Sequence, residues 1–184
     1  MRLLRTSFAV LLAGLLVLPV AADQTDQRLP GLFDELLATK DAASARQLEA
    51  QIWQIWYEHD DNAIVLLMRQ GRGAMDRRDF ASAERSFDQV VKIAPDYAEG
   101  WNARATLYYL MGRYEDSLTD IDATLNLEPR HFGALSGRGL VYAELEEWEL
   151  ALESFDAALA VNPHMAGARM NAEVLRKGLR DKEI

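Results

Sequence analysis

The strongest constraint on this chain is a pattern of large, small and aromatic residues that recurs at a fixed interval and ends each time in proline. Pro95, Pro129 and Pro163 stand 34 residues apart, and each closes the same series. A period of this length indicates a stack of similar structural units, none of which buries its apolar face alone. The most complete copy holds Trp101, Ala105, Tyr108, Gly112, Tyr114, Ser117, Ile121 and Thr124 in its slots.

The spacing within one copy predicts two antiparallel helices joined by a short turn. Gly71, Ala105 and Gly139 share one slot, where a small residue lets the first helix approach the second closely. An aromatic residue follows each turn, and proline ends each second helix because it cannot continue a helix interior. Only the middle turn holds a glycine, Gly112, so the other two first helices must end by other means.

The period and these slots resemble the tetratricopeptide repeat family, strongly over residues 64–163 and weakly in the flanks. The resemblance implies an all-α fold, an α-solenoid of stacked antiparallel helix pairs. It also implies a non-enzymatic module that binds a protein or peptide segment, and it assigns the motif residues to the scaffold. We expect repeats at 64–97, 98–131 and 132–165, a capping hairpin or degenerate repeat at 23–63 and a C-terminal capping helix at 166–184; the residues before them, 1–22, are expected on separate grounds to be a signal peptide.

The N-terminal segment has the layout of a secretory signal peptide. Arg2 and Arg5 precede an uncharged apolar run at 8–20, and small residues end at Ala22, before the first acidic residue. The run is shorter than the roughly 18 to 20 residues that span a bilayer, which favours cleavage after Ala22 over retention as a membrane anchor. We therefore expect an exported, periplasmic protein with no integral membrane segment in the mature chain.

Residues 23–63 are predicted to form a leading pair of helices, with Asp41 as the N-cap of the second helix. They match the repeat pattern poorly, as expected of a terminal unit with only one buried face. Trp53 and Trp56 lie at helical spacing and allow two interpretations. They form an exposed docking surface, or they pack onto the first full repeat, and we favour the packing.

The resemblance also implies which side chains are free to choose a partner. In this family, certain positions of each first helix face the inner, concave surface of the solenoid. The groove predicted here is mixed in character, cationic near one end and apolar along its length. Its predicted lining residues are Met68, Arg69, Arg72, Met75, Asn102, Thr106, Tyr109, Ser136 and Leu140.

Two details of this predicted groove bear on what it binds. Some related domains clamp the C-terminal carboxylate of a chaperone peptide with Lys, Arg and Asn side chains. Only Arg72 among the corresponding residues here is cationic, which argues against that function. Gly133, Ser136 and Gly137 leave room in the third repeat. This face packs against the C-terminal helix, or it receives a helix or extended segment of a partner.

The chain offers little that would support catalysis or metal binding. It has no cysteine, and its histidines are His59, His131 and His164, the last two in corresponding loops. Gly-Arg-Gly at 71–73 and at 137–139 lies within predicted first helices and does not continue as a phosphate-binding motif. An enzyme of unfamiliar type would need a polar pocket with converging titratable groups. We predict no enzyme, no cofactor and no metal.

Charge narrows the choice of partner. The formal net charge is −9, and removing Arg2 and Arg5 would leave 18 basic against 29 acidic side chains. Such a chain is poorly suited to nucleic acid or to anionic lipid. We predict a scaffold or adaptor of the cell envelope that binds a protein or peptide segment. The alternative is a periplasmic chaperone-like holder of apolar segments, which the adaptable side chains Met68, Met75, Tyr109 and Leu140 would suit.

Overall fold

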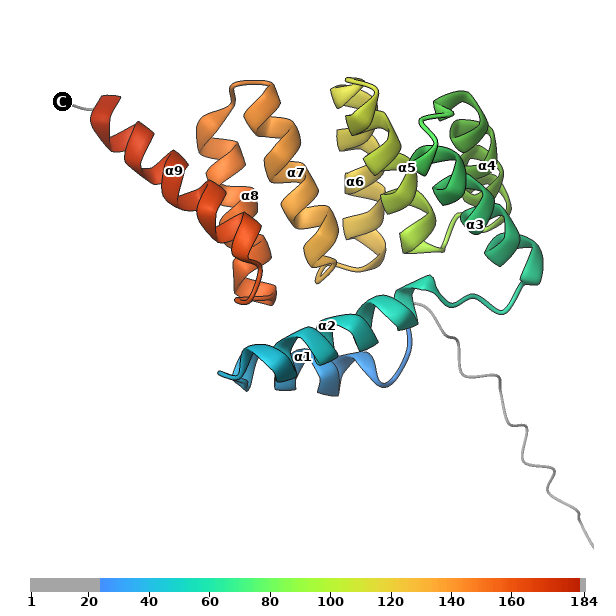
Figure 1. The fold of residues 1–184 in the computed structure, drawn as a ribbon, viewed down its shortest axis with the longest axis horizontal. Coiled ribbons are helices and arrows are strands. Elements are labelled where there is room, and N and C mark those ends of the chain that lie inside the picture. Colours follow the sequence, from blue (N-terminus) through green and yellow to red (C-terminus); the bar gives the residue numbers. More distant parts are fainter. Residues whose placement is uncertain (1–23, 183–184) are drawn as a thin grey trace, which may run out of the picture.

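The computed structural model describes residues 24–182, and every regular element in this range is an α-helix. Figure 1 shows α3 to α9 side by side in chain order, with α1 and α2 lying crosswise along one edge of the row. The prediction of an all-α solenoid of stacked antiparallel helix pairs is confirmed. The expected signal peptide at 1–22 lies outside the described residues. The helices are α1 (Leu29–Ala38), α2 (Ala42–Tyr57), α3 (Asn62–Asp76), α4 (Phe80–Ile93), α5 (Ala98–Leu110), α6 (Tyr114–Leu127), α7 (Phe132–Glu144), α8 (Trp148–Val161) and α9 (Ala166–Lys182).

The two helices of each repeat approach closely at one pair of slots. A Cβ atom added at Gly71 would lie 2.4 Å from Cε1 of Phe87, so no larger residue fits there without movement. The middle repeat has Ala105 in the glycine slot and the smaller Ile121 in the phenylalanine slot, both within one core cluster. A larger residue on the first helix is therefore compensated by a smaller residue opposite it on the second helix. The third repeat has the same pair as the first, Gly139 and Phe155.

The turns inside the repeats share one backbone shape although only one contains glycine. Arg78, Gly112 and Glu146 all adopt positive φ, at 59°, 72° and 59°. In the first repeat the Asp79 amide donates to the carbonyl of Ala74 at 2.9 Å, and the other two turns make the equivalent bond. This is the Schellman arrangement, which satisfies carbonyls at a helix end through one left-handed residue. Two first helices therefore end by placing a non-glycine residue in that conformation.

The α1–α2 hairpin lies elsewhere than predicted. It does not stack on the end of the first repeat; it crosses the loops that join the repeats (Figure 1). Tyr97, His131 and Met165 occupy one slot of the 34-residue period, and all three contact the hairpin. The Tyr97 hydroxyl donates to the Trp56 carbonyl at 2.9 Å, and the His131 ring stacks on the Trp56 ring at 4.1 Å between centroids.

Further contacts extend this edge to the last repeat. The Asn162 amide donates to Glu49 of α2 at 2.6 Å, and the His164 ring lies 3.1 Å from the Leu36 carbonyl of α1. Phe132, at the start of α7, belongs to the same apolar cluster as the buried face of the hairpin. The hairpin therefore joins all three repeats along one edge, because the repeat period places apolar and polar partners there at regular intervals.

Candidate functional site

A groove lies between the first helices of the second and third repeats, α5 and α7. Its volume is about 220 Å³. The floor is formed by buried residues, among them Ala105, Ile121 and Ala134, which are at most 2% exposed. We call this hollow the α5–α7 groove; its upper walls are formed by Asn102, Thr106 and Tyr109 of α5 and by Gly133, Ser136, Gly137 and Leu140 of α7.

Two glycines shape the groove in different ways. A Cβ atom at Gly137 would meet only Cδ1 of Ile121, at 3.9 Å, so the missing side chain leaves open space. A Cβ atom at Gly133 would lie 2.7 Å from Cη2 of Trp53. The room at Gly133 is therefore taken up by the hairpin, an arrangement that neither of the two sequence-based interpretations included. The room at Gly137 stays open.

A second hollow continues the groove towards the C-terminal helix. Its volume is about 420 Å³, and it shares Ser136, Leu140 and Met165 with the α5–α7 groove. Glu49 and Trp53 of the hairpin form one of its walls, and the start of α9 forms another. Sequence reasoning missed this wall because the hairpin was expected at the far end of the solenoid. Trp56 is 1% exposed and belongs to the core, whereas Trp53 is partly exposed and lines the hollow.

The rim of the groove carries hydrogen-bonding groups that are already oriented. The hydroxyls of Tyr109 and Tyr114 donate to the two oxygens of Glu144, at 3.4 and 3.3 Å. Burial raises the pKa of the Tyr109 hydroxyl above its ordinary value, and the charge of Glu144 adds to the rise. Tyr109 therefore remains a neutral donor at physiological pH. The negative end of this rim, at Glu144, favours a partner that brings a donor or a positive charge.

Asn102 is less available than predicted. Its side-chain amide donates to the Glu99 carboxylate at 2.8 Å. Glu99 is 4% exposed and also lies 3.3 Å from Nε2 of the buried His131. A buried carboxylate requires such partners, since an unpaired charge away from water is costly. Asn102 thus has a structural role at the hairpin end of the groove, beside the stack of Trp56 on His131.

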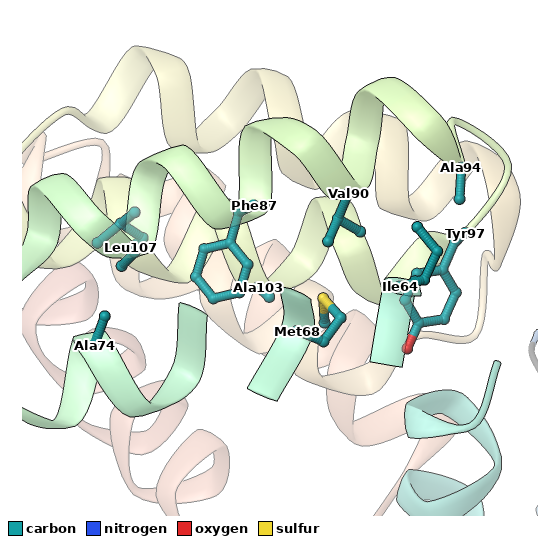
Figure 2. Packing of buried hydrophobic residues seen from close by; sticks show 10 residues of the cluster. Ile64, Met68, Ala74, Phe87, Val90, Ala94, Tyr97, Ala103 and Leu107 are labelled. Atoms are coloured by element: carbon teal, nitrogen blue, oxygen red, sulfur yellow. The ribbon is translucent and has the colours of Figure 1, made fainter. Parts of the chain in front are cut away.

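The predicted residues of the first repeat do not line this groove. Met68 was expected on the concave surface, but it is 1% exposed and belongs to a core cluster with Ile64 and Phe87 (Figure 2). Met75 is partly buried and packs against the same cluster. The Met68 prediction is wrong because neighbouring α5 supplies Ala103 and Leu107 to this cluster and leaves the methionine no exposed surface.

The two predicted arginines lie at different places. Arg72 holds its guanidinium over the ring of Tyr57, 4.7 Å from the centroid, so the end of the hairpin uses it as a cation–π partner. Its Nη1 atom is buried without a hydrogen-bond partner among the described residues. Arg69 lines a separate groove at the outer end of the first repeat. The predicted residues that do line the α5–α7 groove are Asn102, Thr106, Tyr109, Ser136 and Leu140.

The histidines make structural contacts, two of them with nearby backbone amides. His131 Nδ1 accepts from the Ala134 amide at 3.1 Å and so caps α7, while His59 Nδ1 accepts from the Asp61 amide at 3.0 Å. Across residues 24–182, no group of three or more His, Asp or Glu side chains is placed to hold a metal ion. None of the described helices has the length and apolar character needed to cross a bilayer.

The geometry defines a class of protein: an α-solenoid of three helix pairs with a hollowed inner face and a hairpin along one edge. The chain belongs to the tetratricopeptide repeat family, whose model matches residues 68–125 and 102–166. A TPR repeat-containing protein of Rhizobium etli is 39% identical over 115 residues, which are 62% of this chain and 56% of that protein. The match thus spans about half the length of that relative.

Solved structures show the same fold at low identity. The Sgt2 TPR domain from Aspergillus fumigatus has a TM-score of 0.63 at 20% identity, over 67% of this chain and 83% of that one. The first TPR of Spaghetti (RPAP3), solved bound to the HSP90 peptide SRMEEVD, has a TM-score of 0.63 at 17% identity, over 66% of this chain and 96% of that one. These likenesses establish the fold.

Proposed function

We propose that this chain is a non-enzymatic scaffold of the cell envelope that binds a segment of another protein in the α5–α7 groove. The observation that carries the proposal is an apolar floor of buried residues surrounded by hydrogen-bonding side chains. Ligand sites combine these two features, because the apolar part supplies affinity and the polar part fixes orientation. The RPAP3 domain with its bound HSP90 peptide offers a precedent for peptide binding in this family.

The dimensions and chemistry of the groove suggest what part of a partner it takes. An apolar cavity of about 150 Å³ can hold benzene, so the volume of about 220 Å³ accommodates one aromatic or branched aliphatic side chain. Thr106 and Ser136 stand beside this space and can bond the partner's backbone. Glu144 at the rim favours a basic or donor group next to the apolar anchor. The preferred segment is therefore apolar with a neighbouring Lys or Arg.

The envelope location is part of the proposal and rests on the sequence of residues 1–22. Its test is the N-terminal sequence of the protein purified from its native cell. A mature chain that begins at Asp23 agrees with an exported scaffold, whereas retention of residues 1–22 contradicts cleavage.

The alternative function, a chaperone-like holder of apolar segments, loses part of its support. It was motivated by a stripe of adaptable apolar side chains, but Met68 is buried and Met75 packs against the core. Tyr109 and Leu140 remain on the groove, with Met165 added beside them. A groove of about 220 Å³ suits one anchoring side chain better than a succession of unrelated clients.

Site-specific photo-crosslinking tests the proposal, and the chain provides a matched control. Thr106 and Thr119 are both exposed helical threonines whose hydroxyls donate to the carbonyl four residues earlier, at 3.0 Å in each case. Only Thr106 lines the α5–α7 groove. A photoreactive residue at 106 should capture one defined partner in intact cells, and the same residue at 119 should not. Equal capture at both positions, or none at 106, would refute binding in this groove.

A further inference from the structure

None of the residues that the structure describes covers the outer end of the first repeat, because the hairpin lies along the edge of the solenoid instead. Its apolar side chains Val65 and Leu66 are 37% and 43% exposed. In the next two repeats the Leu66 slot holds Gly100 and Ala134, which are buried beneath the preceding repeat. A Cβ atom at Gly100 would lie 2.7 Å from Val90 of α4, so the second helix of the preceding repeat covers this slot. At the first repeat no described helix does so.

A groove of about 630 Å³ runs along this end, between α3 and α4. We call it the end groove. Arg69 and Arg77 of α3 and Arg85 of α4 line it, together with Gln70 and Gln89. All five side chains are exposed.

The repeat period shows that this end differs from the inner junctions in charge. The slots of Arg69 and Arg77 are filled by Ala103 and Met111 in the second repeat, and both pack into the core of the first repeat. The same slots therefore face a neighbouring unit, and at the open end they present guanidinium groups. The first repeat thus has arginine at positions where the second repeat has apolar residues.

Among the described residues, the arginines of the end groove are balanced only in part, by Asp79. Hydrogen bonds from Ser82 lower the pKa of Asp79, and the charges of Arg85 and Arg77 help to lower it. None of Arg69, Arg77 and Arg85 forms an ion pair with a described residue; Arg85 donates to the Ser82 hydroxyl at 2.7 Å. Asp79 is the one carboxylate among the lining residues, and it caps α4 by accepting from the Ser82 amide at 3.2 Å. The groove thus has a net positive charge in a chain whose formal net charge is −9.

The junction between the first and second repeats shows which side chains pair with an arginine on a first helix. Arg104 of α5 pairs with Asp88 of α4, the second helix of the preceding repeat, at 2.8 Å, and with Asp120 at 2.7 Å. A helix that packs on the outer face of a first helix here brings a carboxylate to an arginine. We propose that the end groove and the exposed Leu66 of α3 bind an acidic amphipathic helix of a partner protein, whose apolar stripe covers Leu66 and whose carboxylates pair with the three arginines of the groove.

A second copy of the chain does not fit this end through its own opposite end. That end is α9, where Met170 and Val174 are 62% and 66% exposed. Arg169, Lys177 and Arg180 are exposed on the same helix and outnumber its exposed acids, Glu173 and Asp181. Stacking α9 of one copy on the end groove of another would therefore place like charges together, which costs free energy. The charge pattern selects an acidic partner helix.

The test uses a probe taken from the chain itself. Helix α6, Tyr114–Leu127, is amphipathic and carries four carboxylates, at Glu115, Asp116, Asp120 and Asp122. A labelled, helix-stapled peptide of this sequence is titrated with the full mature chain by fluorescence anisotropy. A second peptide has Gln and Asn in place of the four acids. The wild-type chain should bind the acidic peptide at least tenfold more tightly than the neutral one, with an affinity that falls as salt rises.

Variants locate the binding. Arg69→Glu/Arg85→Glu should weaken binding at least tenfold, whereas Arg169→Glu/Arg180→Glu at the other end should leave it unchanged. Gly137→Phe, which fills the α5–α7 groove, should also leave it unchanged, so this inference and the proposed function can fail separately. Circular dichroism confirms that each variant is helical. Absence of binding at about 1 mM chain, or equal affinity of wild type and Arg69→Glu/Arg85→Glu, would overturn the proposal.

Analytical ultracentrifugation tests whether a second copy of the chain occupies the end groove. A wild-type dimer at micromolar concentration that becomes monomeric in Arg69→Glu/Arg85→Glu would show that a second copy fills the end groove, and would overturn the assignment to a partner protein. A sedimentation coefficient that is the same for wild type and variant supports it.

Discussion

Trp56 and His131 lie face to face, with ring centroids 4.1 Å apart and planes 10° apart, although 75 positions separate them in the chain. Both are at most 1% exposed. One belongs to the N-terminal hairpin and the other caps the first helix of the third repeat. This stack ties the hairpin to the third repeat, and with the other contacts along this edge it places Trp53 as a wall of the second hollow.

Removing this stack should destabilise the whole solenoid edge. Trp56→Ala is expected to cost about 3 to 5 kcal/mol of unfolding free energy, as for other fully buried tryptophans. Leu37→Ala, on the same hairpin but at a side chain 49% exposed, should change it by less than about 0.5 kcal/mol. Urea denaturation measures both. Hydrogen exchange of α1 and α2 should accelerate in His131→Ala; unchanged exchange would mean that the hairpin packs elsewhere.

The Gly71–Phe87 contact predicts a coupled pair of mutations. Gly71→Ala places a Cβ atom 2.4 Å from the Phe87 ring, whereas the middle repeat tolerates Ala105 opposite Ile121. The cost of Phe87→Ile should therefore be smaller in the Gly71→Ala background, by about 0.5 to 3 kcal/mol in a double-mutant cycle. A coupling energy near zero, measured by urea denaturation, would contradict the close approach.

The two non-glycine left-handed turns predict stabilising substitutions. Arg78→Gly and Glu146→Gly should each raise the unfolding free energy by about 0.5 to 1 kcal/mol, since only glycine adopts positive φ without a steric cost. Gly112→Ala should lower it by about 1 kcal/mol for the same reason. Melting temperatures of the three variants check the signs. A loss of stability in both glycine variants would show that Arg78 and Glu146 make contacts that outweigh the strain.

Two helix caps predict how stability depends on pH. Hydrogen bonds from Ser44 lower the pKa of the Asp41 carboxyl, and those from Ser82 lower the pKa of Asp79. A folded-state pKa below the unfolded value contributes stability that is present above the unfolded pKa, near 3.8, and is lost as pH falls through the folded pKa. The unfolding free energy should therefore fall from pH 6 to pH 3. In Asp41→Asn/Asp79→Asn this fall should be smaller; an identical pH profile would contradict the assignment.

The repeat architecture was predictable because the period and the size of the motif residues follow directly from helix packing. The turns at Arg78 and Glu146 were not, since a left-handed backbone at a charged residue leaves no mark on the apolar pattern. Of the predicted groove residues, those of the second and third repeats, such as Thr106 and Leu140, line the candidate α5–α7 groove.

The observed position of the hairpin explains several other differences from the prediction, although not the burial of Met68. Its partners Tyr97, His131 and Met165 recur with the period but lie outside the motif slots, so nothing in the repeat pattern indicates their role. The open end groove is a consequence of the same placement. Arg69, expected on the concave surface, lies there instead.

Filling the α5–α7 groove tests whether it binds a partner segment. Gly137→Phe puts a ring into the open space, because an added Cβ atom there meets only Ile121, at 3.9 Å. Gly178→Phe is the matched control in exposed α9, where nothing lies within 4 Å. The measurement is the affinity of each purified variant for the partner captured at position 106. We expect Gly137→Phe to abolish binding and Gly178→Phe to preserve it; equal affinity of the two variants would refute binding in the α5–α7 groove.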